Sequence, residues 1–124
     1  MSIKKALIVE DNPLNMSLIN IMLKKLSVET INAESGEKAL QIIDESPVDF
    51  LLLDINLGYG ISGITLMEKL RNLEKFQNTP IIAVTAYSYR ELEQYFNENG
   101  FSDYLGKPFK FGQLEKTLNG ANIF

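Results

Sequence analysis

The chain has 124 residues, of which 45% are hydrophobic and 23% charged, and these proportions are ordinary for a globular protein of one domain. It contains no cysteine and no histidine, which excludes disulfide bonds, thiolate and imidazole metal sites, and histidine general bases. The net charge of −4 argues against nucleic acid as a direct partner, because phosphate backbones bind basic surfaces. Any divalent metal ion would have to bind oxygen ligands, which favours Mg²⁺, Mn²⁺ or Ca²⁺.

The apolar runs of the chain are too short to cross a bilayer, and the amino end from Met1 to Lys5 leads into a strand-like run rather than a signal peptide. We therefore expect a soluble, cytoplasmic protein without a membrane partner. The predicted elements occupy the chain, so we expect a single domain over residues 1–124 with no DNA-binding or catalytic output domain.

The first quarter of the chain predicts a strand, a helix and a second strand. Ala6–Val9 is the first buried strand, and Asp11 or Asn12 can cap the helix that follows, with Pro13 in its first turn. Apolar residues at helical spacing predict that this helix covers Pro13–Leu26. The predicted apolar stripe consists of Leu14, Leu18, Ile21, Met22 and Leu26. Val28–Ala33 is the second strand.

The middle of the chain repeats this alternation. Ser35 can cap a second helix, whose apolar side consists of Ala39, Leu40, Ile42 and Ile43. Val48–Leu53 predicts a third strand that ends at Asp54. A glycine-rich loop follows, with Gly58, Gly60 and Gly63. A third helix then carries Leu66, Met67, Leu70 and Leu73.

The last third predicts two more strand and helix pairs. Ile81–Thr85 is the fourth strand, and Ser88 with Glu91 forms a capping-box pattern for a fourth helix that should end near Gly100. The fifth strand is the short Tyr104-Leu105 segment. A turn at Lys107-Pro108 leads to a closing helix with Leu114 and Leu118.

Five short strands that alternate with five helices indicate an α/β fold with a doubly wound parallel sheet and helices on both faces. Ligands of such sheets bind beyond the carboxyl ends of the strands. Polar residues stand at four of these ends, namely Glu10 and Asp11, Asp54, Thr85, and Lys107.

These residues could carry out phosphoryl transfer if the first, third, fourth and fifth strands are neighbours about 5 Å apart. Asp11 and Asp54 could then share one Mg²⁺ ion, which would relieve the repulsion between carboxylates. The Asp54 carboxylate could attack a phosphoryl group, while Lys107 and Thr85 stabilise its oxygens. The product would be an aspartyl phosphate.

The set Glu10-Asp11, Asp54, Thr85-Ala86, Tyr104 and Lys107-Pro108 resembles the receiver domains of two-component response regulators, the CheY-like superfamily. The resemblance covers essentially the whole chain. It implies a flavodoxin-like (βα)5 fold with strand order 2-1-3-4-5.

The resemblance also implies roles for individual residues. Asp54 would accept phosphate from a phosphohistidine on a sensor histidine kinase or a histidine phosphotransfer protein. Asp11, Asp54 and the backbone carbonyl of Asn56 would bind Mg²⁺, for which Mn²⁺ could substitute, with Glu10 assisting through water. Lys107 would pair with the phosphate.

Thr85 and Tyr104 would form the switch implied by the resemblance. The face made of the fourth helix, fifth strand and fifth helix would pass the signal to a downstream protein or output domain, or to a second copy in a phosphorylation-dependent homodimer. The protein would then be a signalling domain that catalyses at most its own phosphorylation and dephosphorylation.

Two departures and three alternatives accompany this interpretation. Gly58 stands where receivers often carry a proline, and the Gly58–Gly63 loop is one residue longer than usual. One alternative is a pseudo-receiver that is never phosphorylated. Another is a small Mg²⁺-dependent phosphatase of the dehalogenase type, but the second carboxylate of its Asp-x-Asp motif is replaced by Asn56. A flavin carrier is disfavoured because Asp11–Asn15 lacks a hydroxyl- and glycine-rich phosphate loop.

Overall fold

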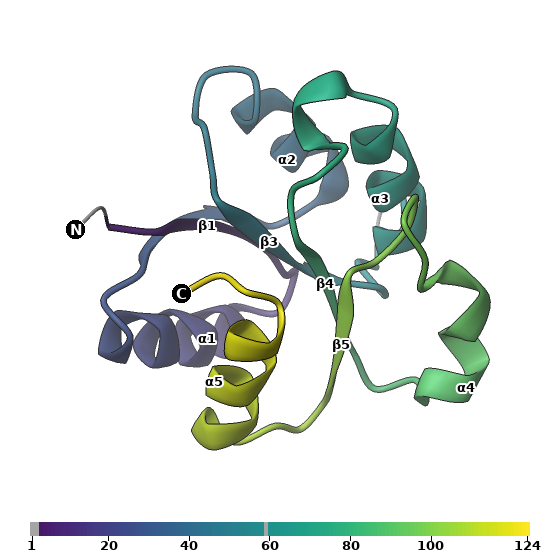
Figure 1. Cartoon of the computed structure of the whole chain (residues 1–124). Coiled ribbons are helices and arrows are strands. Elements are labelled where there is room, and N and C mark those ends of the chain that lie inside the picture. The colour runs from purple at the N-terminus through teal and green to yellow at the C-terminus, as the bar shows by residue number, and fades with distance from the viewer. Residues whose placement is uncertain (1–2, 59) are drawn as a thin grey trace.

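Five parallel strands form one sheet with helices on both of its faces in the computed structural model (Figure 1). The structure describes residues 3–58 and 60–124, so Met1 and Ser2 of the amino-terminal segment and Tyr59 of the glycine-rich loop lie outside the described residues. The strands are β1 (Lys5–Val9), β2 (Glu29–Ala33), β3 (Phe50–Asp54), β4 (Ile81–Thr85) and β5 (Asp103–Gly106). Their spatial order, β2-β1-β3-β4-β5, confirms the predicted fold class.

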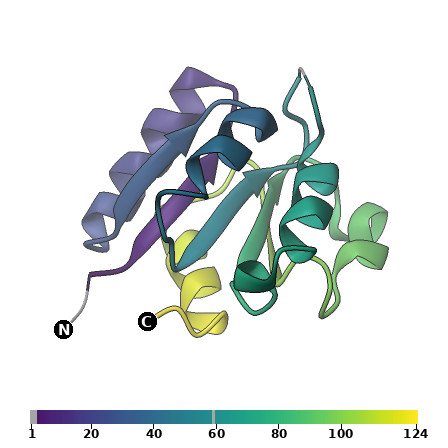
Figure 2. The same ribbon diagram turned by 90° about the horizontal axis from the view of Figure 1, so that it is seen from above.

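The helices connect these strands in the predicted alternation. They are α1 (Pro13–Lys25), α2 (Gly36–Ile42), α3 (Gly63–Arg71), α4 (Tyr89–Leu92) and α5 (Phe111–Gly120). Two short 3₁₀ helices, η1 (Glu74–Phe76) and η2 (Glu93–Tyr95), follow α3 and α4. Figures 1 and 2 show α1 and α5 on one face of the sheet and α2 and α3 on the other.

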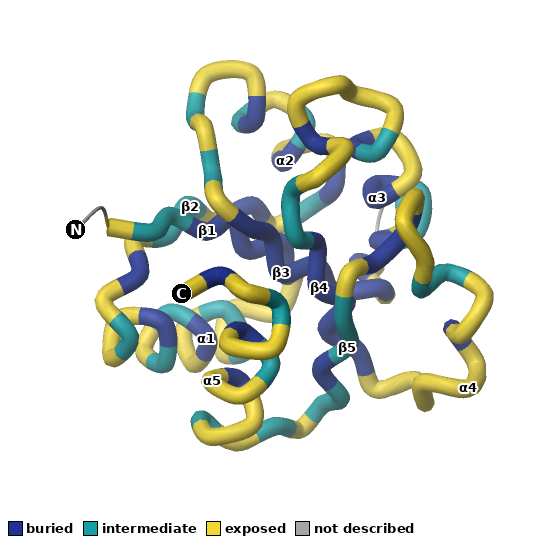
Figure 3. The backbone as a smooth tube through the Cα atoms, viewed as in Figure 1, coloured by how far each residue is buried: buried dark blue, intermediate teal, exposed yellow. Residues whose placement is uncertain are grey.

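The core has two layers because successive side chains of a strand point to opposite faces. In β3, Phe50 and Leu52 pack with α1 and α5, while Leu51 and Leu53 pack with α2 and α3. All four of these side chains are buried, and the central strands are buried along their length (Figure 3). The sheet is therefore a rigid support, and its strand ends hold the residues that follow them in fixed positions.

Side-chain caps fix where several helices begin. Asn12 caps α1 by accepting a hydrogen bond from the backbone of Asn15, and Ser35 caps α2 in the same way. The capping box of Ser88 and Glu91 is present at α4. These contacts confirm the predicted helix starts.

The structure confirms the helix predicted over Pro13–Leu26, but not all of the apolar residues that predicted it lie in the core. The structure buries Ile19 and Leu23, whereas Leu14, Leu18 and Ile21 are 68%, 46% and 55% exposed. Apolar residues lie on more than one side of this helix, so their spacing alone does not select the side that meets the sheet. Three large apolar side chains of α1 consequently face solvent.

The fourth helix is much shorter than predicted, because α4 ends at Leu92 instead of near Gly100. The Asn97 side chain donates to the carbonyl of Gln94 and accepts from the backbone of Asn99. Such side-chain bonds to the backbone compete with helical hydrogen bonds. The segment after η2 is therefore a turn, and Phe96 has an extended backbone.

Strand boundaries shift slightly from the predicted ones, and Asp54 is the last residue of β3 itself. Among the described residues, no helix is both long enough and apolar enough to cross a membrane.

Candidate functional site

The carboxyl ends of β1, β3, β4 and β5 surround a cleft of about 630 Å³. The sheet register places Asp54 beside Val84, and Thr85 beside Gly106, so neighbouring strands end at the same level. The cleft is lined by Glu10, Asp11, Asn12, Asn15, Asp54, Asn56, Gly58, Thr85, Ala86, Tyr87 and Lys107. It brings together all the predicted site residues except Tyr104.

Lys107 connects two buried carboxylates at the floor of this cleft. Its Nζ atom lies 2.6 Å from Glu10 Oε1 and 2.8 Å from Asp54 Oδ2. Glu10 and Asp54 are 2% and 6% exposed, so few water molecules reach either carboxylate. The ammonium therefore supplies the positive charge that these carboxylates need inside the protein.

The pKa values of this cluster reflect burial and mutual charge. Burial raises the pKa of Glu10 above its ordinary value of 4.5, and this effect outweighs the opposite influence of the Lys107 ammonium. The Asp54 carboxylate raises the pKa of Glu10 further. Burial by itself would lower the pKa of Lys107, but Asp54 and Glu10 together hold that pKa above its ordinary 10.5. Lys107 is thus charged at neutral pH.

Asp11 adds a third carboxylate to the cluster. Glu10, Asp11 and Asp54 each offer an oxygen atom, and these oxygens lie within 4.8 Å of one another. Asp54 Oδ1 also accepts a hydrogen bond from the backbone N–H of Asn56 at 3.0 Å. Three carboxylates and one ammonium leave excess negative charge, and an all-oxygen donor set fits Mg²⁺.

Gly58 keeps the space beside Asp11 open. Its φ of +76° is in the left-handed region, and a Cβ atom at this position would lie 2.9 Å from Asp11 Oδ2. Proline is incompatible with such a φ, so the loop departs here from the form that many receivers have. The donor set and this open space both suit a cation held by Asp11 and Asp54.

Thr85 and Tyr104 each form a hydrogen bond with the backbone of Tyr87. Thr85 is buried, and its Oγ1 atom accepts a hydrogen bond from the N–H of Tyr87 at 3.0 Å. Tyr104 lies outside the cleft, where its ring packs edge-on against Tyr89 and Phe96. Its hydroxyl donates to the Tyr87 carbonyl at 2.7 Å.

Sequence reasoning missed two residues of this region. Asn15 of α1 lines the cleft although the predicted pattern gave it no role. Glu37 of α2 accepts a hydrogen bond from the backbone of Ile61 in the loop beside the cleft. No local sequence pattern could have revealed the contact of Glu37, since Glu37 and Ile61 are 24 positions apart.

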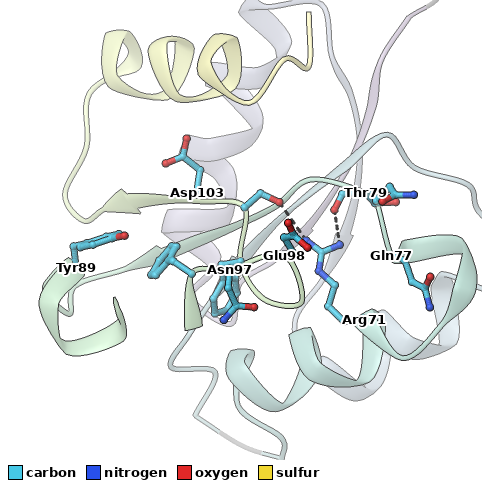
Figure 4. Close-up of a pocket in the computed structure, with 11 residues that line it drawn as sticks. Arg71, Gln77, Thr79, Tyr89, Asn97, Glu98 and Asp103 are labelled. Atoms are coloured by element: carbon cyan, nitrogen blue, oxygen red, sulfur yellow. Dashed lines mark hydrogen bonds between the residues drawn. The ribbon is translucent and has the colours of Figure 1, made fainter. Parts of the chain in front are cut away.

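A second cavity lies at the opposite edge of the sheet, where Arg71 of α3 reaches the segments that precede β4 and β5 (Figure 4). The guanidinium donates to the backbone carbonyls of Phe76, Thr79 and Gly100 and to the hydroxyl of Ser102. These acceptors occupy most of the N–H donors of the guanidinium. Arg71 therefore holds the segments before β4 and β5 against α3, and few of its donors are left to bind a ligand.

Known proteins resemble the chain over nearly all of its length. The family model for the response regulator receiver domain matches residues 6–119. The polar-differentiation response regulator DivK of Brucella ovis is 34% identical over 115 residues, which are 93% of each chain.

Solved structures agree with this assignment. The chemotaxis protein CheY4 of Vibrio cholerae superposes with a TM-score of 0.90 at 25% identity and covers 97% of this chain and 99% of its own. The receiver domain of a sensor histidine kinase from Pseudomonas aeruginosa, which has a magnesium ion in its active-site cleft, superposes with a TM-score of 0.82 at 30% identity over 93% of each chain. The chain therefore belongs to the family of response regulator receiver domains.

Proposed function

We propose that Asp54 accepts a phosphoryl group from a phosphohistidine on a partner kinase or phosphotransfer protein, in a reaction that needs Mg²⁺. The observation that carries this proposal is the position of the Asp54 carboxylate. It is buried at a strand end, bonded to Lys107, and grouped with the carboxylates of Glu10 and Asp11. We further propose that residues 1–124 act as one receiver unit.

In this mechanism, a carboxylate oxygen of Asp54 attacks phosphorus while the bond from phosphorus to the donor imidazole breaks. Asp11, Asp54 and the carbonyl of Asn56 would hold Mg²⁺, with Glu10 assisting through water. The ion, when bound, would neutralise the carboxylates and the phosphoryl oxygens. Lys107 would pair with the phosphoryl group, and the Thr85 hydroxyl would donate a hydrogen bond to it.

The signal would leave the site through Thr85 and Tyr104. A phosphoryl group adds charge and hydrogen-bond acceptors, which can bias a two-state element. The hydrogen bonds that join Thr85 to Tyr87 and Tyr87 to Tyr104 support this route. The surface formed by α4, β5 and α5 would then bind a downstream protein or a second copy of the chain.

An apolar surface next to the cleft suits the phosphodonor. A groove of about 320 Å³ between α1 and the loop after β5 shares Asn15, Ala86 and Lys107 with the cleft. Leu18 of this groove continues the row of exposed apolar side chains on α1, to which Leu14 and Ile21 belong. We propose that a helix of the phosphohistidine protein packs on this surface, which would place its imidazole near Asp54.

The proposal is tested by the mass of the intact protein after incubation with a small phosphodonor and Mg²⁺. The wild-type chain should gain one phosphoryl group, and Asp54→Asn should gain none. A wild-type chain that gains none, under conditions in which a known receiver does, would support the pseudo-receiver alternative. Turnover of a generic phosphate ester would instead support the phosphatase alternative.

A further inference from the structure

The loop between β3 and α3 is held against the first turn of α2 by Glu37. The backbone N–H of Ile61 donates to Glu37 Oε2 at 3.0 Å. Gly60, with a φ of +72°, leaves room for this carboxylate, since a Cβ atom there would collide with both of its oxygens. A glycine is therefore needed for the Glu37 side chain to approach the loop backbone.

An apolar contact accompanies this hydrogen bond. The side chain of Ile61 lies over Gly36, where an added Cβ atom would be 2.5 Å from Ile61 Cγ1. Ile61 also packs against the buried core on this face of the sheet. The loop thus meets α2 at two successive residues of the helix, Gly36 and Glu37.

The same loop borders the acidic cluster. The N–H of Asn56 donates to Asp54 Oδ1, and Gly58 lies against Asp11 Oδ2. At the far end, the N–H of Gly63 donates to the carbonyl of Ile55 at 2.9 Å. The loop is therefore held at one end by Asp54 of β3 and at the other by Ile55 just after this strand, while Gly60 and Ile61 between these points contact α2.

We propose that Glu37 is a positioning residue for the cation site. By holding Gly60 and Ile61 against α2, it keeps Gly58 and Asn56 in place beside Asp11 and Asp54. Glu37 does not belong to the acidic cluster itself. This inference rests on the proposed function only in taking Mg²⁺ as the cation of the site.

A different explanation would be that the negative charge of Glu37 attracts the cation through space. Three variants distinguish the positioning role from this effect of charge. Glu37→Ala removes both the charge and the hydrogen-bond acceptor, whereas Glu37→Gln removes the charge and keeps an acceptor oxygen. Glu34→Ala is the matched control, because Glu34 is an exposed acidic residue just before α2 and its loss changes the net charge equally.

Two measurements need no phosphodonor. The first is the dissociation constant for Mg²⁺ by calorimetric titration, and the second is hydrogen exchange at the Ile61 amide in metal-free protein. Glu37→Ala should weaken Mg²⁺ binding about fivefold, the effect of losing one hydrogen bond. It should also speed exchange at Ile61. Glu37→Gln and Glu34→Ala should stay within about twofold of wild type in both measurements.

Two results would overturn the inference. One is unchanged Mg²⁺ binding in Glu37→Ala. The other is a Glu37→Gln variant as weak as Glu37→Ala, which would assign the effect to charge. A wild-type chain that accepts no phosphoryl group would defeat the proposed function, but the Mg²⁺ and exchange results would still decide the role of Glu37.

Discussion

The hydroxyl of Tyr104 donates a hydrogen bond of 2.7 Å to the backbone carbonyl of Tyr87, and the N–H of the same Tyr87 donates to Thr85 Oγ1. One residue thus joins the threonine in the cleft to the aromatic side chain outside it. In the proposed mechanism, a displacement of the Thr85 hydroxyl would change the bonding of Tyr87, and this change would reach Tyr104. We therefore propose the loop after β4 as the route from the site to the surface of α4 and β5.

We expect Thr85→Ala to uncouple Tyr104 from the site. When Mg²⁺ and beryllofluoride, a phosphoryl mimic, are added to wild type, the ring signals of Tyr104 in NMR spectra should shift. The shift should be lost in Thr85→Ala, which lacks the hydroxyl, and retained in Thr85→Ser, which keeps it. Equal shifts in all three proteins would exclude this route.

Asp11→Asn should weaken Mg²⁺ binding by roughly tenfold or more, because the site loses one of its charged oxygen ligands. The dissociation constant can be measured by calorimetric titration. Asp44→Asn is a suitable control, since Asp44 is an exposed carboxylate just after α2 and outside the acidic cluster. Equal affinities of the two variants would show that Asp11 is not a ligand.

The raised pKa of Glu10 predicts a pH dependence of stability in metal-free protein. As pH rises above 4.5, the Glu10 carboxyl loses its proton in the unfolded chain before it does so in the folded chain. The free energy of unfolding therefore falls until the pH has passed the pKa of Glu10 in the folded chain. Glu10→Gln cannot ionise and should not share this loss. The free energy of unfolding, measured with urea and a chelator, should therefore fall for wild type relative to Glu10→Gln as pH rises from 4.5. If the difference in free energy of unfolding between the two proteins did not change with pH, the raised pKa of Glu10 would be contradicted.

Replacing Leu14 and Leu18 of α1 together by serine should slow phosphoryl transfer from a phosphohistidine protein. Each side chain is partly exposed, and burial against a partner helix would contribute about 1 kcal/mol, so a tenfold or greater loss is expected. Phosphorylation by a small donor should keep its rate, because such a donor needs no docking surface. Leu73→Ser, at another exposed apolar residue, is the control. Equal loss with both donors would point to damage of the site itself.

The sequence predicts the sheet and the cleft well for a physical reason. Buried parallel strands are continuous apolar runs, and their ends lie at one edge of the sheet, so Asp54, Thr85 and Lys107 meet once the strand order is known. That order came from the family resemblance, and the structure confirms it. Periodicity alone could not supply it.

Other features depend on contacts that local patterns do not contain. Which side of α1 meets the sheet depends on the neighbouring elements, so the helical spacing predicts the helix but not that Leu14 and Leu18 are exposed. The capping box marks only where α4 begins, so it does not predict the change to η2 after Leu92 or the turn at Asn97 beyond it. The contact of Glu37 with Ile61 joins two elements that only the folded chain brings together.

The most direct test of the central claim is to locate the phosphoryl group on the chain. Borohydride reduces an acyl phosphate of aspartate to homoserine, which peptide mass spectrometry can assign to a position. After incubation with a small phosphodonor and Mg²⁺, we predict homoserine at position 54 in wild type and at no position when Mg²⁺ is chelated. Homoserine at position 11, 2-amino-5-hydroxypentanoic acid (the product that glutamate would give) at position 10, or no modification in wild type would contradict the assignment of Asp54 as the phosphoacceptor.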